Sequence, residues 1–273
     1  MMISSKDNPQ VKALKRLIHQ PKRNDALMAV EGVHACQLLL KHQAHQVYQS
    51  VHDWRIERIW VGSSALDNEE IQVLLSAVVT QGIQVIKLAT AVFRDISSLE
   101  QGVSIVFEVQ RPKMHSLSED AFSGNVVLLD GVQDPGNMGS IIRSCAAAGV
   151  REVWLSEHCV NPYAPKVLRA GVGAHFGLNI RERIDLNQAI VQLQHHGVQV
   201  CATSSHTKLS IYQHDLSCPT AWLMGNEGAG LREALLAQAD VPLTIPMVVG
   251  ESLNVAAATA VCVFEMARQQ QGG

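Results

Sequence analysis

The chain has 273 residues, of which 47% are hydrophobic and 17% charged, so it is long enough to form two folded domains with buried cores. Its formal net charge of −3 argues against a protein that coats nucleic acid through bulk electrostatic attraction, although a net charge hides local patches. Its apolar runs are far shorter than the roughly 20 residues that span a bilayer, and residues 1–6 lack the features of a secretory signal, so we expect no membrane span and a cytoplasmic protein.

Residues 1–108 are predicted to form a small α/β domain. Asn8 and Pro9 are a good cap and first-turn pair, and apolar residues follow at helical spacing, so a helix is expected to open the chain. A short strand is expected to end near Gly32. Further strands are expected over 56–61, 85–88 and 103–109, and helices over 33–40 and 69–80.

The first 25 residues carry a local excess of positive charge. The basic residues are Lys6, Lys12, Lys15, Arg16, Lys22 and Arg23, against Asp7 and Asp25. Such an excess suits contacts with RNA phosphates, but an ordinary solvated helix face has the same composition. The sequence leaves both interpretations open.

The composition shifts near residue 110 to polar residues without apolar periodicity, so we place an interdomain linker at 109–124 and a second domain at 125–273. In this second domain, strand-like runs alternate with helical segments. The runs cover 126–129, 153–155, 198–202, 221–224 and 241–246. Such alternation predicts an open parallel sheet with helices on both faces.

Three segments of the second domain each follow a predicted strand, and the carboxyl ends of parallel strands meet at one edge of a sheet, where ligands bind. The first segment runs from Leu129 to Arg143, and its glycines allow a tight turn before a helix that we expect to begin at Ser140 and to end at Gly149. Arg143 would lie near the start of this helix, where a guanidinium can hold a phosphate. The alternative is a surface arginine on an ordinary strand-to-helix loop.

The second and third segments are weak signals when each is taken alone. The second runs from Leu223 to Leu231 and contains three glycines, which let the backbone approach a ligand closely. The third runs from Ile245 to Val255 and leads into a helix whose apolar stripe is best explained by core packing. Neither the first nor the second segment has the G-x-G-x-x-G pattern of nicotinamide-dependent enzymes.

Together, in this order and spacing, the three segments resemble the signature motifs of the SpoU family within the SPOUT superfamily. The first resembles N-x-G-x-I-x-R, with matches at Asn137, Gly139, Ile141 and Arg143. The second resembles G-N/S-E-G-x-G-L at 225–231, and the third resembles I-P-M followed by S-L-N-V, with a loop between Met247 and Ser252 one residue shorter than the commonest form. The resemblance is strong over 125–268 and weaker over the first half.

This resemblance implies an α/β protein in which a parallel-sheet SPOUT domain with a deep trefoil knot follows a smaller, ribosomal-protein-like substrate-binding domain. The implied activity is transfer of a methyl group from S-adenosylmethionine to a ribose 2′-hydroxyl of ribosomal or transfer RNA. Family members are homodimers with sites near the interface, so a homodimer is expected and both chains can contribute residues. The reaction needs no metal ion, and none is expected.

The resemblance also implies roles for individual residues. Arg143 matches the arginine on which SpoU enzymes depend, and because arginine stays protonated in proteins, we expect it to hold RNA phosphate and stabilise a developing alkoxide. Glu227 is the competing candidate for the general base. Asn137, Ser252 and Asn254 are expected to orient the ribose or the arginine. The expected cofactor contacts are Thr203, Leu223, Gly225, Asn226, Gly228, Ile245, Met247 and Leu253.

Two other classes of protein stay open. A non-catalytic RNA-binding protein could retain the methyltransferase fold, but the intact site residues speak against it. A nicotinamide-dependent oxidoreductase is disfavoured by the absent dinucleotide-binding pattern.

The cysteines and histidines give no metal or nucleophile pattern, since the six cysteines lack a C-x-x-C pair. We interpret them as reduced thiols, with Cys145, Cys201 and Cys262 as small buried hydrophobes. The pairs His42 and His45, and His195 and His196, are interpreted as surface histidines.

Overall fold

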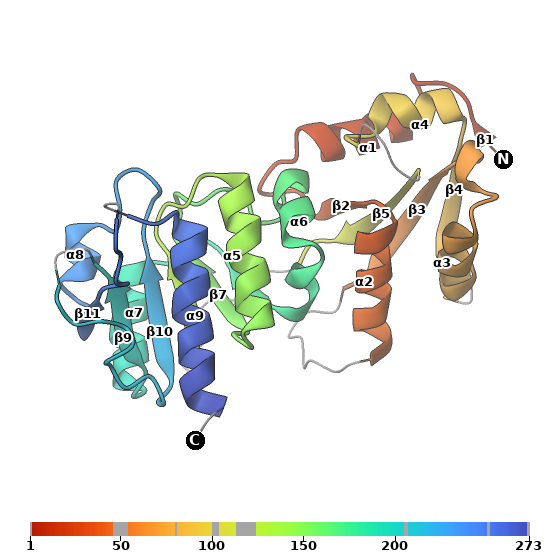
Figure 1. Cartoon of the computed structure of the whole chain (residues 1–273). Coiled ribbons are helices and arrows are strands. Elements are labelled where there is room, and N and C mark those ends of the chain that lie inside the picture. The colour runs from red at the N-terminus through yellow and green to blue at the C-terminus, as the bar shows by residue number, and fades with distance from the viewer. Residues whose placement is uncertain are drawn as a thin grey trace. The chain divides into compact units, whose positions relative to one another are not determined.

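The computed structural model describes residues 2–45, 54–79, 81–99, 104–112, 124–204, 207–249 and 252–271. By its internal contacts the chain divides into two compact units (Figure 1). Unit 1 comprises Met1–Lys113 and Tyr163–Phe176, and unit 2 comprises Met114–Pro162 and Gly177–Gly273. The segment Tyr163–Phe176, which the sequence patterns placed in the second domain, therefore makes its contacts within unit 1. The domain bounds 1–108, 109–124 and 125–273 stay a prediction.

Unit 1 is built on a five-stranded mixed sheet of order β1-β4-β3-β5-β2, in which β5 is antiparallel to β2 and β3. Its elements in chain order are β1 (Met2–Ile3), α1 (Pro9–His19), β2 (Leu27–Glu31), α2 (Val33–His45), β3 (Ile56–Gly62), a 3-10 turn (Ser63–Ala65), α3 (Glu69–Val79), β4 (Gln84–Leu88), α4 (Thr90–Ile96), β5 (Ile105–Gln110) and, from later in the chain, α6 (Pro165–Gly171).

The opening helix α1 forms where the cap pattern predicts it. The Asn8 side chain accepts a hydrogen bond from the backbone N–H of Gln10 at 2.9 Å, and Pro9 occupies the first helical turn. Its apolar residues are buried against a core that includes Trp60 and Phe93. Two elements escaped prediction, β1 and α4, because runs of two and seven residues are too short to show periodicity. Helix α2 continues to His45, past the predicted end.

Unit 2 contains a six-stranded sheet of order β11-β9-β10-β6-β7-β8, and all of its strand pairs are parallel, as predicted. Its elements are β6 (Val126–Leu129), α5 (Pro135–Ala147), β7 (Glu152–Leu155), β8 (Asn179–Arg181), α7 (Leu186–His195), β9 (Gln199–Thr203), β10 (Thr220–Met224), α8 (Glu233–Leu236), β11 (Val241–Leu243) and α9 (Val255–Gln271). A 3-10 turn (Ala174–Gly177) precedes β8, and all of it except Gly177 belongs to unit 1.

Helices cover both faces of this sheet. Helix α7 packs its buried apolar residues against alternate residues of β6, β9 and β10. Helices α5 and α9 lie side by side on the other face (Figure 1). No helix among the described residues combines the length and the apolar character that a membrane span needs.

Helix α5 begins at Pro135, five residues before the predicted start at Ser140. The reason is an N-cap that was overlooked because the nearby glycines suggested a turn. The Asp134 side chain accepts a hydrogen bond from the backbone N–H of Asn137 at 2.8 Å, and Pro135 occupies the first helical turn. Gly136 and Gly139 are therefore helical residues rather than turn residues. The predicted end holds, since Gly149 has a φ of +82° directly after the helix.

Candidate functional site

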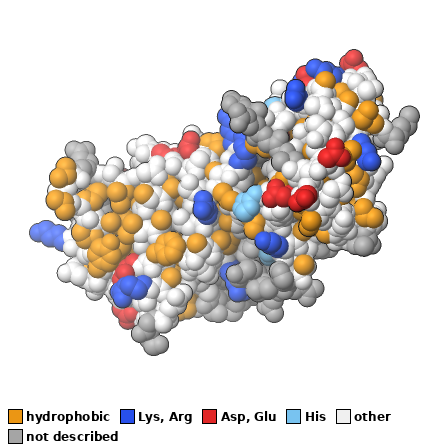
Figure 2. All heavy atoms as spheres, turned by 45° about the vertical axis from the view of Figure 1, so that its right-hand side comes forward, with side chains coloured by type: hydrophobic (Ala, Val, Ile, Leu, Met, Phe, Trp, Pro, Cys, Tyr) orange, Lys and Arg blue, Asp and Glu red, His pale blue; other side chains and the backbone are white. Residues whose placement is uncertain are grey.

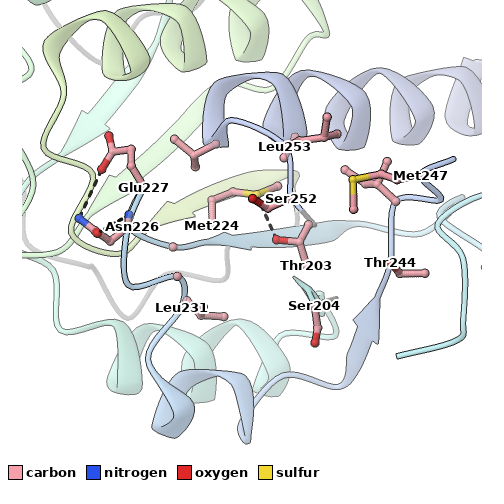
Figure 3. Close-up of a pocket in the computed structure, with 16 residues that line it drawn as sticks. Thr203, Ser204, Met224, Asn226, Glu227, Leu231, Thr244, Met247, Ser252 and Leu253 are labelled. Carbon is pink, nitrogen blue, oxygen red and sulfur yellow. Dashed lines mark hydrogen bonds between the residues drawn. The ribbon is translucent and has the colours of Figure 1, made fainter. Parts of the chain in front are cut away.

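A pocket of about 270 Å³ lies at the carboxyl ends of β9, β10 and β11 (Figure 3). One wall consists of the loop that follows β10, and another of the segment that leads into α9. The lining residues are Thr203, Ser204, Met224, Gly225, Asn226, Glu227, Gly228, Gly230, Leu231, Thr244, Ile245, Met247, Ser252, Leu253, Val255 and Ala258. The second and third sequence motifs thus meet at one edge of the sheet, where parallel strands place their ligands.

Most of the predicted cofactor contacts line this pocket. They are Thr203, Gly225, Asn226, Gly228, Ile245, Met247 and Leu253. Leu223 does not: it is fully buried in the core cluster beneath α7, because successive residues of β10 point to opposite faces of the sheet. Its neighbour Met224 lines the pocket instead.

The sequence predictions missed several lining residues. They are Ser204, Met224, Gly230, Leu231, Thr244, Val255 and Ala258. Three of them lie at strand ends, since Met224 ends β10 and Ser204 and Thr244 directly follow β9 and β11. Met224 is also the last residue of the predicted strand 221–224, so listing the last residue of each parallel strand would have found it; Ser204 and Thr244 follow strand ends that the sequence placed at 202 and 246.

The loop after β10 is closed by its own hydrogen bonds. The backbone N–H of Asn226 donates to the carbonyl of Gly230, and that of Gly230 donates back, each at 3.0 Å. The Asn226 side chain accepts from the N–H groups of Gly228 and Ala229 and donates to the Gly131 carbonyl at 2.7 Å. A Cβ atom on Gly225 would lie 2.2 Å from the backbone nitrogen of Leu231. Only glycine allows this closure.

Glu227 joins this loop to the start of α5. Its carboxylate accepts the backbone N–H groups of Gln133 at 3.3 Å and Asp134 at 3.1 Å, and the side-chain amides of Asn137 and Asn226 at 3.1 and 3.3 Å. Partial burial acts to raise the pKa of Glu227, but the bonds from Asn137 and the two backbone amides outweigh it and leave the pKa below its ordinary value. The group is therefore an ionised acceptor at neutral pH.

Asn137 and Asn254 extend this junction to the third motif. Asn254 donates through Nδ2 to Oδ1 of Asn137 at 2.9 Å, while its own Oδ1 accepts the backbone N–H of Ala256 in the first turn of α9. Glu227, Asn137 and Asn254 thus form one hydrogen-bonded row that links all three motifs. Ser252 lines the pocket beside it.

Arg143 lies apart from the pocket lining. It is exposed on α5, six residues after Asn137, on the same helix face as Gly136, Ser140 and Ala147. Among the described residues it has no hydrogen-bond or ion-pair partner, so its guanidinium is open to solvent. Side chains on a helix generally lean toward its start, and Asn137, which belongs to the row of amides, lies in the first turns of this same helix.

The basic residues of α1 and its flanks are mostly paired with acidic side chains. Lys6 and Lys15 both contact Asp95 at 2.8 Å, and their hydrogen bonds lower the pKa of that carboxyl to about 2. In addition, Lys12 pairs with Asp7 and Arg16 with Asp25. These ion pairs favour the interpretation of this segment as a solvated helix face.

The cysteines behave as buried hydrophobes. Cys145, Cys201 and Cys262 are buried, and burial raises the pKa of the Cys145 and Cys201 thiols to about 12. His195 is exposed and His196 and His42 are half-buried, while the His45 side chain lies outside the described residues. Over the described ranges, no cluster of three or more histidine, cysteine or acidic side chains could hold a metal ion.

Comparison with known proteins places this arrangement in a family. The model of the SpoU rRNA methylase family matches residues 124–264. A protein of Pseudomonas putida named 23S rRNA (guanosine-2′-O-)-methyltransferase RlmB is 31% identical over 90% of this chain and 98% of its own. An uncharacterized tRNA/rRNA methyltransferase of Synechocystis is 30% identical, over 98% of this chain and 94% of its own.

A solved structure agrees with these relatives. The AdoMet-bound rRNA methyltransferase from Sinorhizobium meliloti superposes with a TM-score of 0.82 at 27% identity, covering 98% of this chain and 97% of that one. The motifs, the parallel sheet and these likenesses coincide, and the chain belongs to the SpoU rRNA methylase family.

Proposed function

We propose that the protein methylates a ribose 2′-hydroxyl of ribosomal RNA, with S-adenosylmethionine as the methyl donor. The observation that carries this proposal is the row from Glu227 through Asn137 to Asn254, which joins the three family motifs at the rim of one pocket. The relatives named for guanosine 2′-O-methylation of 23S rRNA support ribosomal over transfer RNA as the substrate.

The pocket fits the methyl donor in size and chemistry. Its volume of about 270 Å³ is close to the lower end of the range of about 300–1,000 Å³ for small-molecule sites. Leu231, Ile245 and Leu253 offer apolar surface for an adenine ring, Thr203 and Thr244 offer hydroxyls, and the glycine loop exposes its backbone. When bound, the cofactor supplies an electrophilic methyl group on a sulfonium.

The chain's own task is to position and activate the ribose hydroxyl. We assign Arg143 to binding the RNA phosphate and to stabilising the negative charge that develops on the attacking oxygen. Its guanidinium is permanently charged, can donate two hydrogen bonds at once, has no partner among the described residues and lies on the same helix as Asn137. We assign Asn137, Ser252 and Asn254 to orienting groups.

Glu227 is better suited to organisation than to proton removal. Its oxygens already accept four hydrogen bonds, and its lowered pKa makes it a poor base for a ribose hydroxyl. We therefore assign it the task of holding the start of α5 against the cofactor loop.

Replacing Glu227 with glutamine tests this assignment. The new amide group would face two donors, the Gln133 N–H and the Asn226 amide, so the cofactor loop should loosen and cofactor affinity should fall about fivefold, the effect of losing roughly 1 kcal/mol of hydrogen bonding. Titration with S-adenosylhomocysteine measures this loss. A variant that binds normally but transfers no methyl group would instead make Glu227 the base.

The pH dependence gives a second readout for Glu227. A carboxylate whose pKa is lowered on folding stabilises the native state above its ordinary value of 4.5, and this contribution is lost as the pH falls through the lowered folded value. Because Glu227 stays ionised throughout this range, we expect the wild-type cofactor affinity not to change between pH 6 and pH 8. An inflection near neutral pH that disappears in Glu227→Gln would contradict the assignment.

We further propose a homodimer formed through α5 and α9. The apolar stripe of α9, interpreted from the sequence as core, is partly exposed: the Phe264 side chain is 50% accessible, and Leu253 and Ala257 are also exposed. Hydrophobic side chains gather over unit 2 on the face shown in Figure 2. A second copy would cover this surface and bring its own residues toward the exposed side of Arg143.

Phe264→Glu is expected to convert the dimer to a monomer, because a charge would be buried at the centre of the apolar face. Light scattering during size-exclusion chromatography at micromolar concentration gives the mass directly. Val191→Glu on α7, equally exposed but on the opposite face of the sheet, is the matched control. A monomeric wild type would rule out this interface.

Family membership also supports proposals about the knot, the choice of RNA and the cellular location. We propose that unit 2 carries the deep trefoil knot, supported by a sheet in which β10 lies between β6 and β9. We also propose that residues 1–108 choose the RNA and that the protein acts in the cytoplasm, where its relatives' substrates are made.

One experiment tests the activity itself. The full chain is incubated with methyl-labelled S-adenosylmethionine and unmodified total RNA, and the alkali-resistant 2′-O-methylated position is mapped. Label in a ribose of 23S rRNA is the expected result. Label confined to a base or to protein, or no label at all, would overturn the proposal.

A further inference from the structure

A second junction lies on the other side of the cofactor loop, between two residues that do not line the pocket. Asp130 is the first residue after β6, and Arg232 is the first residue after the loop. The Nε–H of Arg232 donates to Oδ2 of Asp130 at 2.7 Å. The Asp130 side chain is only 4% exposed, whereas that of Arg232 is 53% exposed.

This ion pair anchors the end of the loop that lies farthest along the chain from the bonds made by Asn226 and Glu227. Upstream, Gly225 continues β10 and Asn226 is held to Gly131. Downstream, Leu231 forms part of the pocket wall and packs against the edge of the core. Arg232 comes next in the chain, so its ion pair with Asp130 fixes the position of the chain directly after Leu231.

The buried carboxylate needs this partner. Among the described residues, Arg232 is the only group that hydrogen-bonds the Asp130 carboxylate, and a buried unpaired charge is costly. The carboxylate of Asp185, at the cap of α7, also attracts Arg232. Both acidic groups thus favour the guanidinium at this position, and Arg232 does not line the pocket.

We propose that Asp130 and Arg232 are positioning residues that hold the loop 225–231 in its cofactor-binding shape and so set affinity for the methyl donor without touching it. This inference rests on the proposed function, because it takes the pocket to be the donor site. It assigns a role to Asp130, which the motifs left without one, and to Arg232, which lies just beyond them.

The chain contains a matched pair for comparison. Arg268 contacts Glu265 at 2.8 Å near the end of α9, with a similar division of exposure, 69% for the arginine and 8% for the glutamate. Neither residue lines the pocket or follows one of its strands. Glu265 also accepts the side-chain amide of Gln269 at 2.9 Å. Breaking this pair therefore tests the loss of an arginine from a buried carboxylate that keeps one other hydrogen bond, whereas breaking Asp130–Arg232 tests the effect on the loop.

Binding of S-adenosylhomocysteine is measured by calorimetric titration for the wild type, Arg232→Met, Asp130→Asn, the double variant and Arg268→Met. We expect Arg232→Met to weaken binding at least about tenfold, and the double variant to lose less than the product of the two single losses, because removing both charges leaves none stranded. Arg268→Met is expected to bind as the wild type does. The inference would be overturned if the fold-loss of affinity in the double variant equalled the product of the two single losses, or if Arg232→Met and Arg268→Met lost affinity equally.

Amide hydrogen exchange without cofactor provides a readout that is independent of the activity. The N–H groups of Gly228, Ala229 and Gly230 are bonded within the loop, so Arg232→Met should speed their exchange and Arg268→Met should not. Unchanged protection in Arg232→Met would refute the positioning role. If Arg232→Met does not fold, Arg232→Lys replaces it. Lysine retains the charge but not the Nε–H, so a smaller loss of affinity and a smaller rise in exchange are expected, and neither change would refute the positioning role.

These two readouts separate this inference from the proposed function. A wild type that fails to bind S-adenosylhomocysteine would overturn the donor site and, with it, the effect on affinity. A wild type that binds, together with variants of Arg232 that bind equally well, would leave the methyltransferase assignment standing and remove only the positioning role.

Discussion

Arg143→Ala is expected to bind S-adenosylmethionine as tightly as the wild type and to lose methyl transfer by about 10²–10³-fold, the cost of removing one donor to a developing oxyanion. Binding should persist because Arg143 does not line the pocket. Stability should persist because the side chain is exposed and no described residue pairs with it. Single-turnover transfer to RNA and a separate cofactor titration measure the two effects.

The controls for this variant separate chemistry from RNA affinity. Arg94→Ala removes another exposed arginine, from α4, and accounts for the loss of one positive charge. Arg143→Lys retains the charge but not the planar fork, so partial recovery is expected at saturating RNA. Normal transfer by Arg143→Ala would exclude the assigned role. Weakened cofactor binding would place the arginine at the donor site instead.

Gly225→Ala is expected to destroy the cofactor site. Its Cβ atom would lie 2.2 Å from the Leu231 nitrogen and 2.3 Å from the Gly230 carbonyl carbon, both of which are backbone atoms that no side-chain rotation can move. The loop must open to relieve the overlap, so we expect cofactor affinity to fall at least about tenfold and stability to fall by about 1–3 kcal/mol. Thermal unfolding with and without S-adenosylhomocysteine reports both quantities.

Gly228→Ala is the matched control in the same loop. Its Cβ atom would meet only the Asn226 side-chain oxygen, at 3.6 Å, an ordinary contact, and Gly228 does not have a positive φ. This variant should retain the stability of the wild type. Equal destabilisation by the two substitutions would show that the loop tolerates no side chain for some reason other than the close approach at Gly225.

Local sequence signals predicted most of the elements correctly. Helix α1 follows from Asn8 and Pro9 and a regular apolar spacing, and five of the six strands of unit 2 follow from short apolar runs; β8, whose three residues include Asn179 and Arg181, was not predicted. The start of α5 was wrong because Gly136 and Gly139 suggested a turn, whereas Asp134 and Pro135 already provide a helix start. A cap acts on the backbone of its own turn, so it decides the boundary even where glycine has a low helix propensity.

The sequence predicted which residues belong to the site better than it predicted the hydrogen bonds between them. The strand ends and motifs indicated Thr203, Gly225, Ile245 and Leu253, which line one pocket, whereas Leu223 lies in the core one residue before the pocket-lining Met224. Glu227 was a candidate base in the sequence. Three of its four hydrogen bonds, which argue for an organising role, come from groups 90 to 94 residues away in the chain, and no local sequence pattern indicates them.

The sequence by itself determined the parallel sheet, the three motifs at its edge and the family, because these depend on residue type and on spacing along the chain. Only the tertiary structure decided that Asn254 reaches Asn137, that Arg232 neutralises the buried Asp130, and that Tyr163–Phe176 packs within unit 1. The physical reason is that hydrogen bonds and ion pairs depend on distance in space. Residues far apart in the chain become neighbours only when the strands take their order in the sheet.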